Sequence, residues 1–339
     1  MQALARRINK ELDLIKFDSL FSGFERPRFA LYNDGYLYYP DKIMPYKKEK
    51  NVTIIGELDL DSPLAINVSM VVKQMFLDFL SSHYQMHFPN YLKILDYPFN
   101  YLNIDYMCYE KNLLLKGFLT KDLNEKLNYL RMFMNVRHIR KDLIDDYIKE
   151  EYKNETINGL CEFIFYKVLK QLSPRLAHQY INEEIHSIKI YSRDFFDLHH
   201  QNHFVGCMLM MMLEDLKIRF SAFDLKNRTI FETILGKVEY IEEMISYIPT
   251  EGLIANIKRY NNEIKECFID FFAYKTKKTS GEFKIIGFDP FRMIKNDNQI
   301  YHQNFVKIQD KYGKIYFING PVITRGNDDV VTCYFERTD

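Results

Sequence analysis

Tryptophan is absent from this sequence of 339 residues, and cysteine is scarce. The five cysteines are odd in number and far apart, and no two of them form a C-x-x-C pair. This spacing excludes an obvious disulfide framework, so we expect buried free thiols in a reducing compartment. The cysteines are Cys108, Cys161, Cys207, Cys267 and Cys333.

An excess of charge of either sign is also missing. Lys and Arg together number 46, as do Asp and Glu, so the formal net charge is zero. No overall field then attracts nucleic acid or an anionic membrane, and we expect neither as a partner. The N-terminus lacks the apolar stretch of a secretory signal, and no apolar run reaches the ~20 residues that span a bilayer. A cytoplasmic location is expected, and the abundance of Lys, Asn, Ile and Tyr is typical of a bacterial protein.

The motifs that most often reveal an activity do not occur. The sequence has no phosphate-binding glycine loop, no G-x-S-x-G turn and no helix-turn-helix signature. It also has no internal repeat of the length that builds a helical solenoid. The function must therefore be sought in weaker patterns.

The patterns that are present predict an α+β fold in three parts. Residues 1–62 should form a helix and a small β-sheet, and residues 63–278 should form a large helical region. Residues 279–339 contain short β-rich runs separated by Gly, Asn and Asp, which predicts a small antiparallel sheet domain. Strands, then many helices, then strands is an α+β order rather than an alternating βαβ order.

Local signals place the elements of the N-terminal part. Apolar residues at helical spacing predict a helix over about 3–22. Asn33-Asp34-Gly35 is a hairpin turn signal between two β-prone runs, and residues 51–58 read as a third strand. Ser62 as N-cap and Pro63 at the first helical position then open a helix that runs to about His83.

Long helical patterns fill the central part. Few glycines interrupt them, which suits helices joined by short connections. One segment, "RHIRKDLIDDYIKEEYK" (137–153), carries opposite charges at i, i+4 spacing and is expected to be a solvated face. The predicted helices cover about 102–118, 121–148, 150–171, 174–187, 193–217, 229–247 and 250–275.

Three segments of the helical region carry a further pattern. "SMVVKQMFLDFL" (69–80) has a Lys-Gln pair on an apolar helix that follows a strand, and the later segments are "NGLCEF" (158–163) and "HFVGC" (203–207). In this order they resemble gluzincin-type zinc peptidases, whose motifs are an H-E-x-x-H helix, a helix that begins E-G-L-A-E-Y, and a Y-x-x-G-A helix start. In H-E-x-x-H two imidazoles at i, i+4 bind one zinc ion and the Glu is the general base.

The resemblance implies a gluzincin-like topology in which the zinc site has been lost. Lys73 stands at the first ligand, Gln74 at the general base and Leu77 at the second ligand. Asn158 stands at the third ligand and His203 at the tyrosine that would stabilise the oxyanion. Because an ammonium and a leucine cannot hold Zn²⁺, no cofactor and no peptidase activity are expected.

The resemblance thus implies a pseudoenzyme that binds a peptide or protein partner in a degenerate cleft. The cleft residues are Lys73, Gln74, Leu77, Asn158, Glu162 and His203. A lysine in the metal position should pair with a carboxylate, for which Glu162 and Glu57 are the candidates. The plainer alternative is that Lys73 and Gln74 form a polar strip on a half-buried helix, their stems covering apolar neighbours.

Two other functions remain open. His199, His203 and Cys207 recur every four residues and share one helix face, so a metallohydrolase could hold Zn²⁺ there, although a structural role beside the Met-rich stripe is more ordinary. His83 and His87 form a weaker pair, since Pro89 follows at once. The other alternative is a non-enzymatic interaction protein that binds its partner through the C-terminal sheet.

Overall fold

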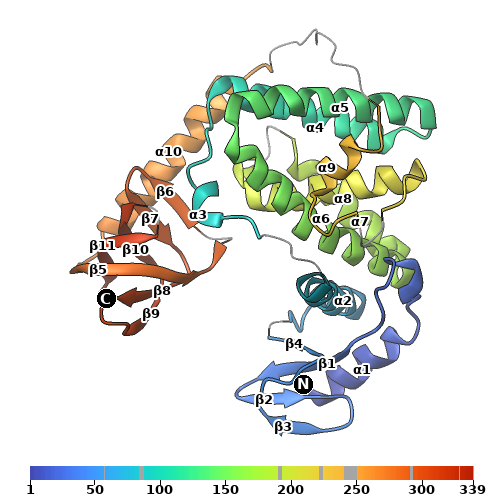
Figure 1. Cartoon of the computed structure of the whole chain (residues 1–339). Coiled ribbons are helices and arrows are strands. Elements are labelled where there is room, and N and C mark those ends of the chain that lie inside the picture. The colour runs from blue at the N-terminus through green and yellow to red at the C-terminus, as the bar shows by residue number, and fades with distance from the viewer. Residues whose placement is uncertain are drawn as a thin grey trace.

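The computed structural model describes residues 1–56, 58–83, 88–189, 193–220, 224–239, 250–290, 293–327 and 329–338. The fold is α+β, with a small mixed sheet near the N-terminus, a helical centre and an antiparallel sheet at the C-terminus (Figure 1). Glu57 and His87 lie outside the described residues, and so do the predictions of Glu57 as a partner of Lys73 and of a His83–His87 pair.

The N-terminal part begins with α1 (Gln2–Leu12) and a 3-10 turn (Phe17–Ser19), followed by a sheet in the order β3-β2-β1-β4. Its strands are β1 (Arg28–Asn33), β2 (Tyr36–Tyr38), β3 (Ile43–Pro45) and β4 (Val52–Ile55). The predicted hairpin is confirmed, because β1 and β2 pair antiparallel. Asp34 and Gly35 take φ of 48° and 81° at its turn, a region that glycine enters without strain. The predicted third strand is β4, which pairs parallel to β1.

The helical centre is built around one long helix, α6, which packs against α2 and α8. Its helices are α2 (Leu64–His83), α3 (Tyr91–Ile94), α4 (Tyr101–Leu119), α5 (Leu123–Ile144), α6 (Asp146–Leu172), α7 (Pro174–Ser187), a 3-10 turn η2 (Arg193–Phe196), α8 (Leu198–Asp215), α9 (Ile230–Leu235) and α10 (Leu253–Phe272). Figure 1 shows α2 between the N-terminal sheet and the remaining helices. The largest apolar core is shared by these helices and α1.

Some predicted helix boundaries are wrong. The helix expected over 3–22 ends at Leu12, because Phe21 and Phe24 turn back to pack edge-on against Phe76 of α2, at 5.2 and 5.0 Å between ring centroids. This packing overrides a local helical period. The break expected near residue 149 falls instead at Asp145, where φ is 39°.

The helix expected over 229–247 is also wrong in its described part. α9 ends at Leu235, and Gly236 begins a turn. Residues 240–247 of that prediction lie outside the described part of the chain.

The close contact of α6 with α8 depends on two glycines. A Cβ added to Gly206 would lie 2.1 Å from the carbonyl oxygen of Glu155, and one added to Gly159 would lie 2.6 Å from the Cα of Gly206. No side chain fits at either position, so the two backbones touch directly. Both glycines lie inside helices, where the missing side chains let α6 and α8 approach closely.

The C-terminal sheet is antiparallel throughout and has the order β6-β7-β10-β11-β5-β8-β9. Its strands are β5 (Thr276–Phe288), β6 (Met293–Asn296), β7 (Gln299–His302), β8 (Phe305–Asp310), β9 (Ile315–Asn319), β10 (Val322–Asn327) and β11 (Val330–Arg337). The sheet has a core of its own, and α10 joins it by packing Phe268 and Phe271 against Ile323.

Among the helices of the described ranges, α2 is long and apolar enough over Leu64–Ser82 to cross a membrane by length and composition, and 44% of that window is buried inside the protein. A core helix passes the same test. Val68, Val72 and Met75 of α2 are fully buried in the main core. All five cysteines are free thiols, and each is buried except Cys267, which is half-buried.

Candidate functional site

Lys73 of α2 faces α6, where it forms an ion pair with Glu162. The ammonium lies 2.5 Å from Oε2 of Glu162, and the two side chains are 25% and 8% exposed. Tyr180 of α7 donates a hydrogen bond to the other carboxylate oxygen of Glu162. Burial opposes the charge on Lys73, but the Glu162 carboxylate outweighs it and raises the pKa of the lysine. A charged bridge therefore links α2, α6 and α7.

The other residues of the expected cleft are not all brought to this bridge. Gln74 donates a hydrogen bond to Asp78 on its own helix, and Leu77 packs against the main apolar core. Asn158 lies one turn before Glu162 on α6 and donates to the side-chain oxygen of Asn154 at 2.6 Å. The bridge thus contains Lys73 and Glu162, while the remaining positions make separate local contacts.

His203 and Cys207 lie on the buried face of α8 near the same bridge. The rings of His199 and His203 meet edge to face at 4.5 Å between centroids, and His199 also meets the ring of Tyr91 at 5.0 Å. Burial lowers the pKa of His199 to about 4 and that of His203 well below its usual value, so both imidazoles are neutral at pH 7. Burial likewise raises the pKa of Cys207 well above its usual value and keeps it a thiol.

The residues at the expected zinc positions do not fit a zinc ion. Lys73, Leu77 and Asn158 offer an ammonium, an alkyl group and an amide, none of which is a usual zinc ligand, and the ammonium is already paired. Across the described ranges, no three His, Cys, Asp or Glu side chains are grouped so that they could hold a metal ion.

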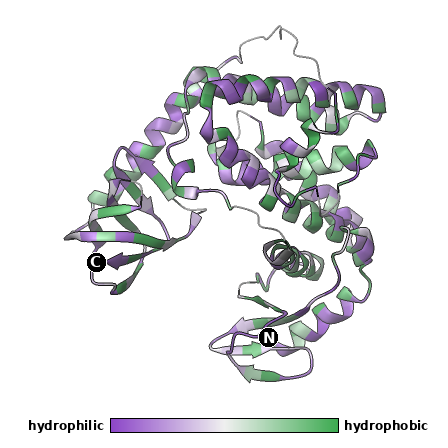
Figure 2. Cartoon of the chain, in the orientation of Figure 1, coloured by the Kyte–Doolittle hydropathy of each residue, from purple (hydrophilic) through white to green (hydrophobic). Residues whose placement is uncertain are grey.

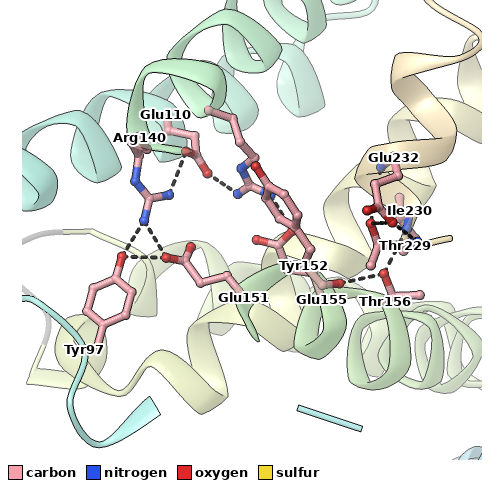
Figure 3. A network of polar contacts seen from close by, with 11 residues as sticks. Tyr97, Glu110, Arg140, Glu151, Tyr152, Glu155, Thr156, Thr229, Ile230 and Glu232 are labelled. Atoms are coloured by element: carbon pink, nitrogen blue, oxygen red, sulfur yellow. Dashed lines mark hydrogen bonds and ion pairs between the residues drawn. The ribbon is translucent and has the colours of Figure 1, made fainter. Parts of the chain in front are cut away.

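A second polar cluster lies deeper in the helical region and was not anticipated from the sequence (Figure 3). Arg137 of α5 is paired with Glu110 of α4 and with Glu155 of α6. Arg140 is paired with Glu110 and with Glu151, each at 2.7 Å. These five side chains are at most 4% exposed, so three helices are joined by charges inside the protein.

Tyr97 completes one end of this buried charge cluster, which is defined by Glu110, Arg137, Arg140, Glu151 and Glu155. Its hydroxyl donates to Glu151 and accepts from Arg140, each at 2.5 Å. At the other end, the Thr156 hydroxyl accepts from the backbone N–H of Ile230 at 2.8 Å and so ties the start of α9 to α6. Figure 3 shows the Tyr97 ring beside Glu151 and the Thr156 side chain beside Ile230.

The three carboxyl groups of the buried charge cluster face only two guanidinium groups. Burial opposes ionisation of Glu110, but Arg137 and Arg140 outweigh it and hold the pKa of Glu110 below its usual value. For Glu155 burial dominates over the attraction of Arg137 and raises the pKa to about 7. Glu155 is therefore the carboxyl that can take a proton near neutral pH.

The expectation of a solvated face over 137–153 holds for Asp142, Asp146 and Lys149, which are exposed, but it is wrong for the other side of the segment. Arg137, Arg140, Glu150 and Glu151 are all buried, although Figure 2 shows hydrophilic turns along α5. Alternating charges at i, i+4 look alike on a solvated helix and on one that pairs with neighbours. One signal in the sequence could have indicated that the segment pairs with other helices. Basic residues are in excess before Asp145, and acidic residues are in excess after it.

The chain was compared with known proteins. No family model matches it, and no curated protein or solved structure matches it either.

Proposed function

We propose that this chain is a non-catalytic, metallopeptidase-like protein that binds a peptide partner between α2 and α6. The observation that carries the proposal is the Lys73–Glu162 ion pair. It connects the two helices whose sequences resemble the zinc-binding helices of gluzincins, at the position of the first zinc ligand. On this view a fixed cation has replaced the metal as the link between the helices.

The surroundings of the ion pair support binding rather than catalysis. Lys73 keeps a quarter of its side chain exposed, and Gln74 and Asn158 are only partly buried. Amide and ammonium groups can donate hydrogen bonds to peptide carbonyls or a terminal carboxylate. Gln74, which stands at the general-base position of the resemblance, is an amide bonded to Asp78, and the Glu162 carboxylate is already held by Lys73 and Tyr180.

A double-mutant cycle tests whether the Lys73–Glu162 ion pair links α2 to α6. We expect Lys73→Met and Glu162→Gln to be coupled by about 1–3 kcal/mol in the free energy of unfolding. Either change alone leaves the other, largely buried residue without its oppositely charged partner. The exposed pair Lys149 and Asp146, with side chains 55% and 56% exposed, is the control and should couple by less than about 0.5 kcal/mol. Equal coupling in the two cycles would show that Lys73 is an ordinary surface lysine.

Selection from a randomised peptide library tests whether the protein binds a peptide. The immobilised protein should enrich a consensus peptide, and Gln74→Met should abolish the enrichment. Gln179→Met is the matched control, because Gln179 also bonds to an acid at i+4 on an exposed helix but lies on α7. No enrichment over bare resin, or an equal loss in both variants, argues against a peptide site at Gln74.

Restoring the zinc motif tests the kinship of the two helices with gluzincins. The variant Lys73→His, Gln74→Glu, Leu77→His and Asn158→Glu should take up about one equivalent of Zn²⁺ if the helices have that geometry. The parent protein should retain none after dialysis. Retention of zinc by the parent that is lost in His199→Ala would instead support the relocated metal site.

A further inference from the structure

A cavity of about 300 Å³ is lined in part by α4, and its lining residues include none of the buried charge cluster and neither residue of the Lys73–Glu162 bridge. Apolar groups make up much of its wall, and the described residues that line it include no acid. They are Cys108, Lys111, Asn112, Leu115, Ile188, Lys189, Phe195 and Thr250. Small-ligand sites in proteins typically combine such an apolar wall with a few polar groups.

The unusual group in this wall is Lys111, a lysine that is only 4% exposed. Its ammonium lies 2.8 Å from the side-chain oxygen of Gln201 and 4.3 Å from the centroid of the Phe195 ring. Both contacts are to neutral groups, and within the described part of the chain Lys111 forms no ion pair. Lys126 makes a useful comparison, because its side chain is 3% exposed yet is paired with Asp215 at 2.7 Å.

The charges around Lys111 come from three helices and oppose one another. Burial lowers the pKa of Lys111 to about 8, aided by Arg140 on α5, while Cys108 and Glu110 on α4 and Glu151 on α6 act against it. At pH 7 roughly one molecule in ten then carries a neutral amine, against about one in 2,500 for an ordinary lysine. The neighbouring thiol is the weaker candidate nucleophile, because burial raises the pKa of Cys108 to about 12.

We propose that Lys111 is a carbonyl-binding lysine, whose amine forms a reversible Schiff base with a small keto or aldehyde acid held in this cavity. A desolvated lysine in an apolar pocket is the usual form of an imine-forming residue. Lys189 at the exposed rim supplies a positive charge for the carboxylate of such a ligand, and no described lining residue repels it. The site is independent of the peptide-binding function proposed above.

The reaction requires no oxidant or metal. The neutral amine nitrogen of Lys111 attacks the carbonyl carbon, and the carbonyl oxygen takes up a proton to give a carbinolamine. Loss of the hydroxyl as water leaves the protonated C=N bond, and addition of water reverses the step. Cyanoborohydride, if added, delivers a hydride to that carbon and converts the imine into a stable secondary amine.

Reductive trapping of the full-length protein with glyoxylate and cyanoborohydride tests this proposal. Peptide mass spectrometry should find Lys111 alkylated at least about tenfold faster than Lys189 and Lys126 at pH 7. At pH 10 the advantage over Lys189 should fall several-fold, since exposed amines then become neutral as well. Labelling of Lys111 at the rate of Lys126 or slower at pH 7 would overturn the proposal.

Gln201→Glu provides a variant that retains the lysine and the cavity. A carboxylate at the position of the Gln201 oxygen should restore charge to Lys111 and slow its labelling at pH 7 by at least tenfold, with Lys189 unaffected. An unchanged rate at Lys111 in a folded variant would also overturn the proposal. Retention of the far-ultraviolet circular dichroism spectrum shows that the variant is folded.

Discussion

Buried ionisable side chains determine how single residues in this protein respond to pH. His302 of β7 is 1% exposed, and its Nε2 lies 3.0 Å from the Thr324 hydroxyl. Burial lowers the pKa of His302 to about 4. Since the unfolded chain binds the proton at about pH 6.5, the folded state loses stability as pH falls from 6.5 towards 4.

The first prediction concerns this histidine. Below pH 6.5 the His302→Asn variant should lose less stability on acidification than the parent, by up to about 3 kcal/mol at pH 4, the free energy of a shift of ~2.5 pKa units. Urea unfolding at a series of pH values measures the difference. Replacement of His178 by Asn is the control for a histidine that folding leaves exposed. Parallel curves for His302→Asn and the parent would mean that His302 is not buried as a neutral imidazole.

The second prediction concerns the buried charge cluster. Arg140→Met leaves Glu110 and Glu151 without one guanidinium partner, and we expect a loss of about 3–5 kcal/mol in the free energy of unfolding. Arg259→Met removes an exposed i, i+4 partner of Glu263 and should cost less than about 0.5 kcal/mol. Denaturant midpoints for both variants at pH 7 measure the two values. Similar small losses would mean that water reaches the Arg140 pairings.

At the scale of elements, the packing of α6 on α8 is the central contact of the helical region. α6 carries both the Lys73 partner Glu162 and the carboxyl groups Glu151 and Glu155 of the buried charge cluster. A change in the distance between α6 and α8 should therefore disturb the core and both polar clusters together.

The third prediction follows from the two glycines at this contact. Gly206→Ala places a methyl group against the backbone of α6, and we expect at least about 3 kcal/mol of destabilisation or failure to fold. Gly236→Ala is the control, because its nearest neighbour atom would lie at 3.6 Å and its φ is −82°. The control should change stability by less than about 1 kcal/mol. Thermal unfolding followed by circular dichroism separates the two, and a mild effect at Gly206 would require a wider helix spacing.

At the scale of the whole molecule, the C-terminal sheet is attached to the helical region through α10 and through Leu92 and Leu95 at α3. Phe271 is fully buried against the sheet, while Ile269 on the same helix is 68% exposed. Beside Leu95, Asp96 forms an ion pair with Lys295 of the sheet at 2.5 Å.

The fourth prediction concerns this attachment. Phe271→Ala removes a large buried ring, should cost about 3–5 kcal/mol, and should speed amide exchange in 276–338 more than in α6. Ile269→Ala should leave exchange unchanged in both regions. Hydrogen exchange with mass spectrometry resolves the two regions. A uniform acceleration along the chain would show that helices and sheet open as one unit.

Local signals in the sequence determined the order and kind of the elements. The α+β class, the hairpin at Asp34 and Gly35, and the central helices α4 to α7 follow from turn residues and apolar periodicity, which act over a few residues. Those signals do not specify which face of a polar helix meets another helix. Only the tertiary structure decided that Arg137 and Arg140 are buried, because their partners lie on other helices.

The candidate sites also combine features that the sequence determines with features that only the tertiary structure decides. The position of Lys73 on an apolar helix and its possible partner Glu162 could be named from the sequence, but the pair is 89 residues apart and forms only when α2 packs on α6. Lys111 gave no signal, because a lysine in a helical sequence looks the same whether it faces water or a cavity. Its environment is set by Gln201 and Phe195, which reach it from distant parts of the chain. Short-range periodicity determined the helices and strands. Packing between distant parts of the chain decided which ionisable side chains are buried away from water.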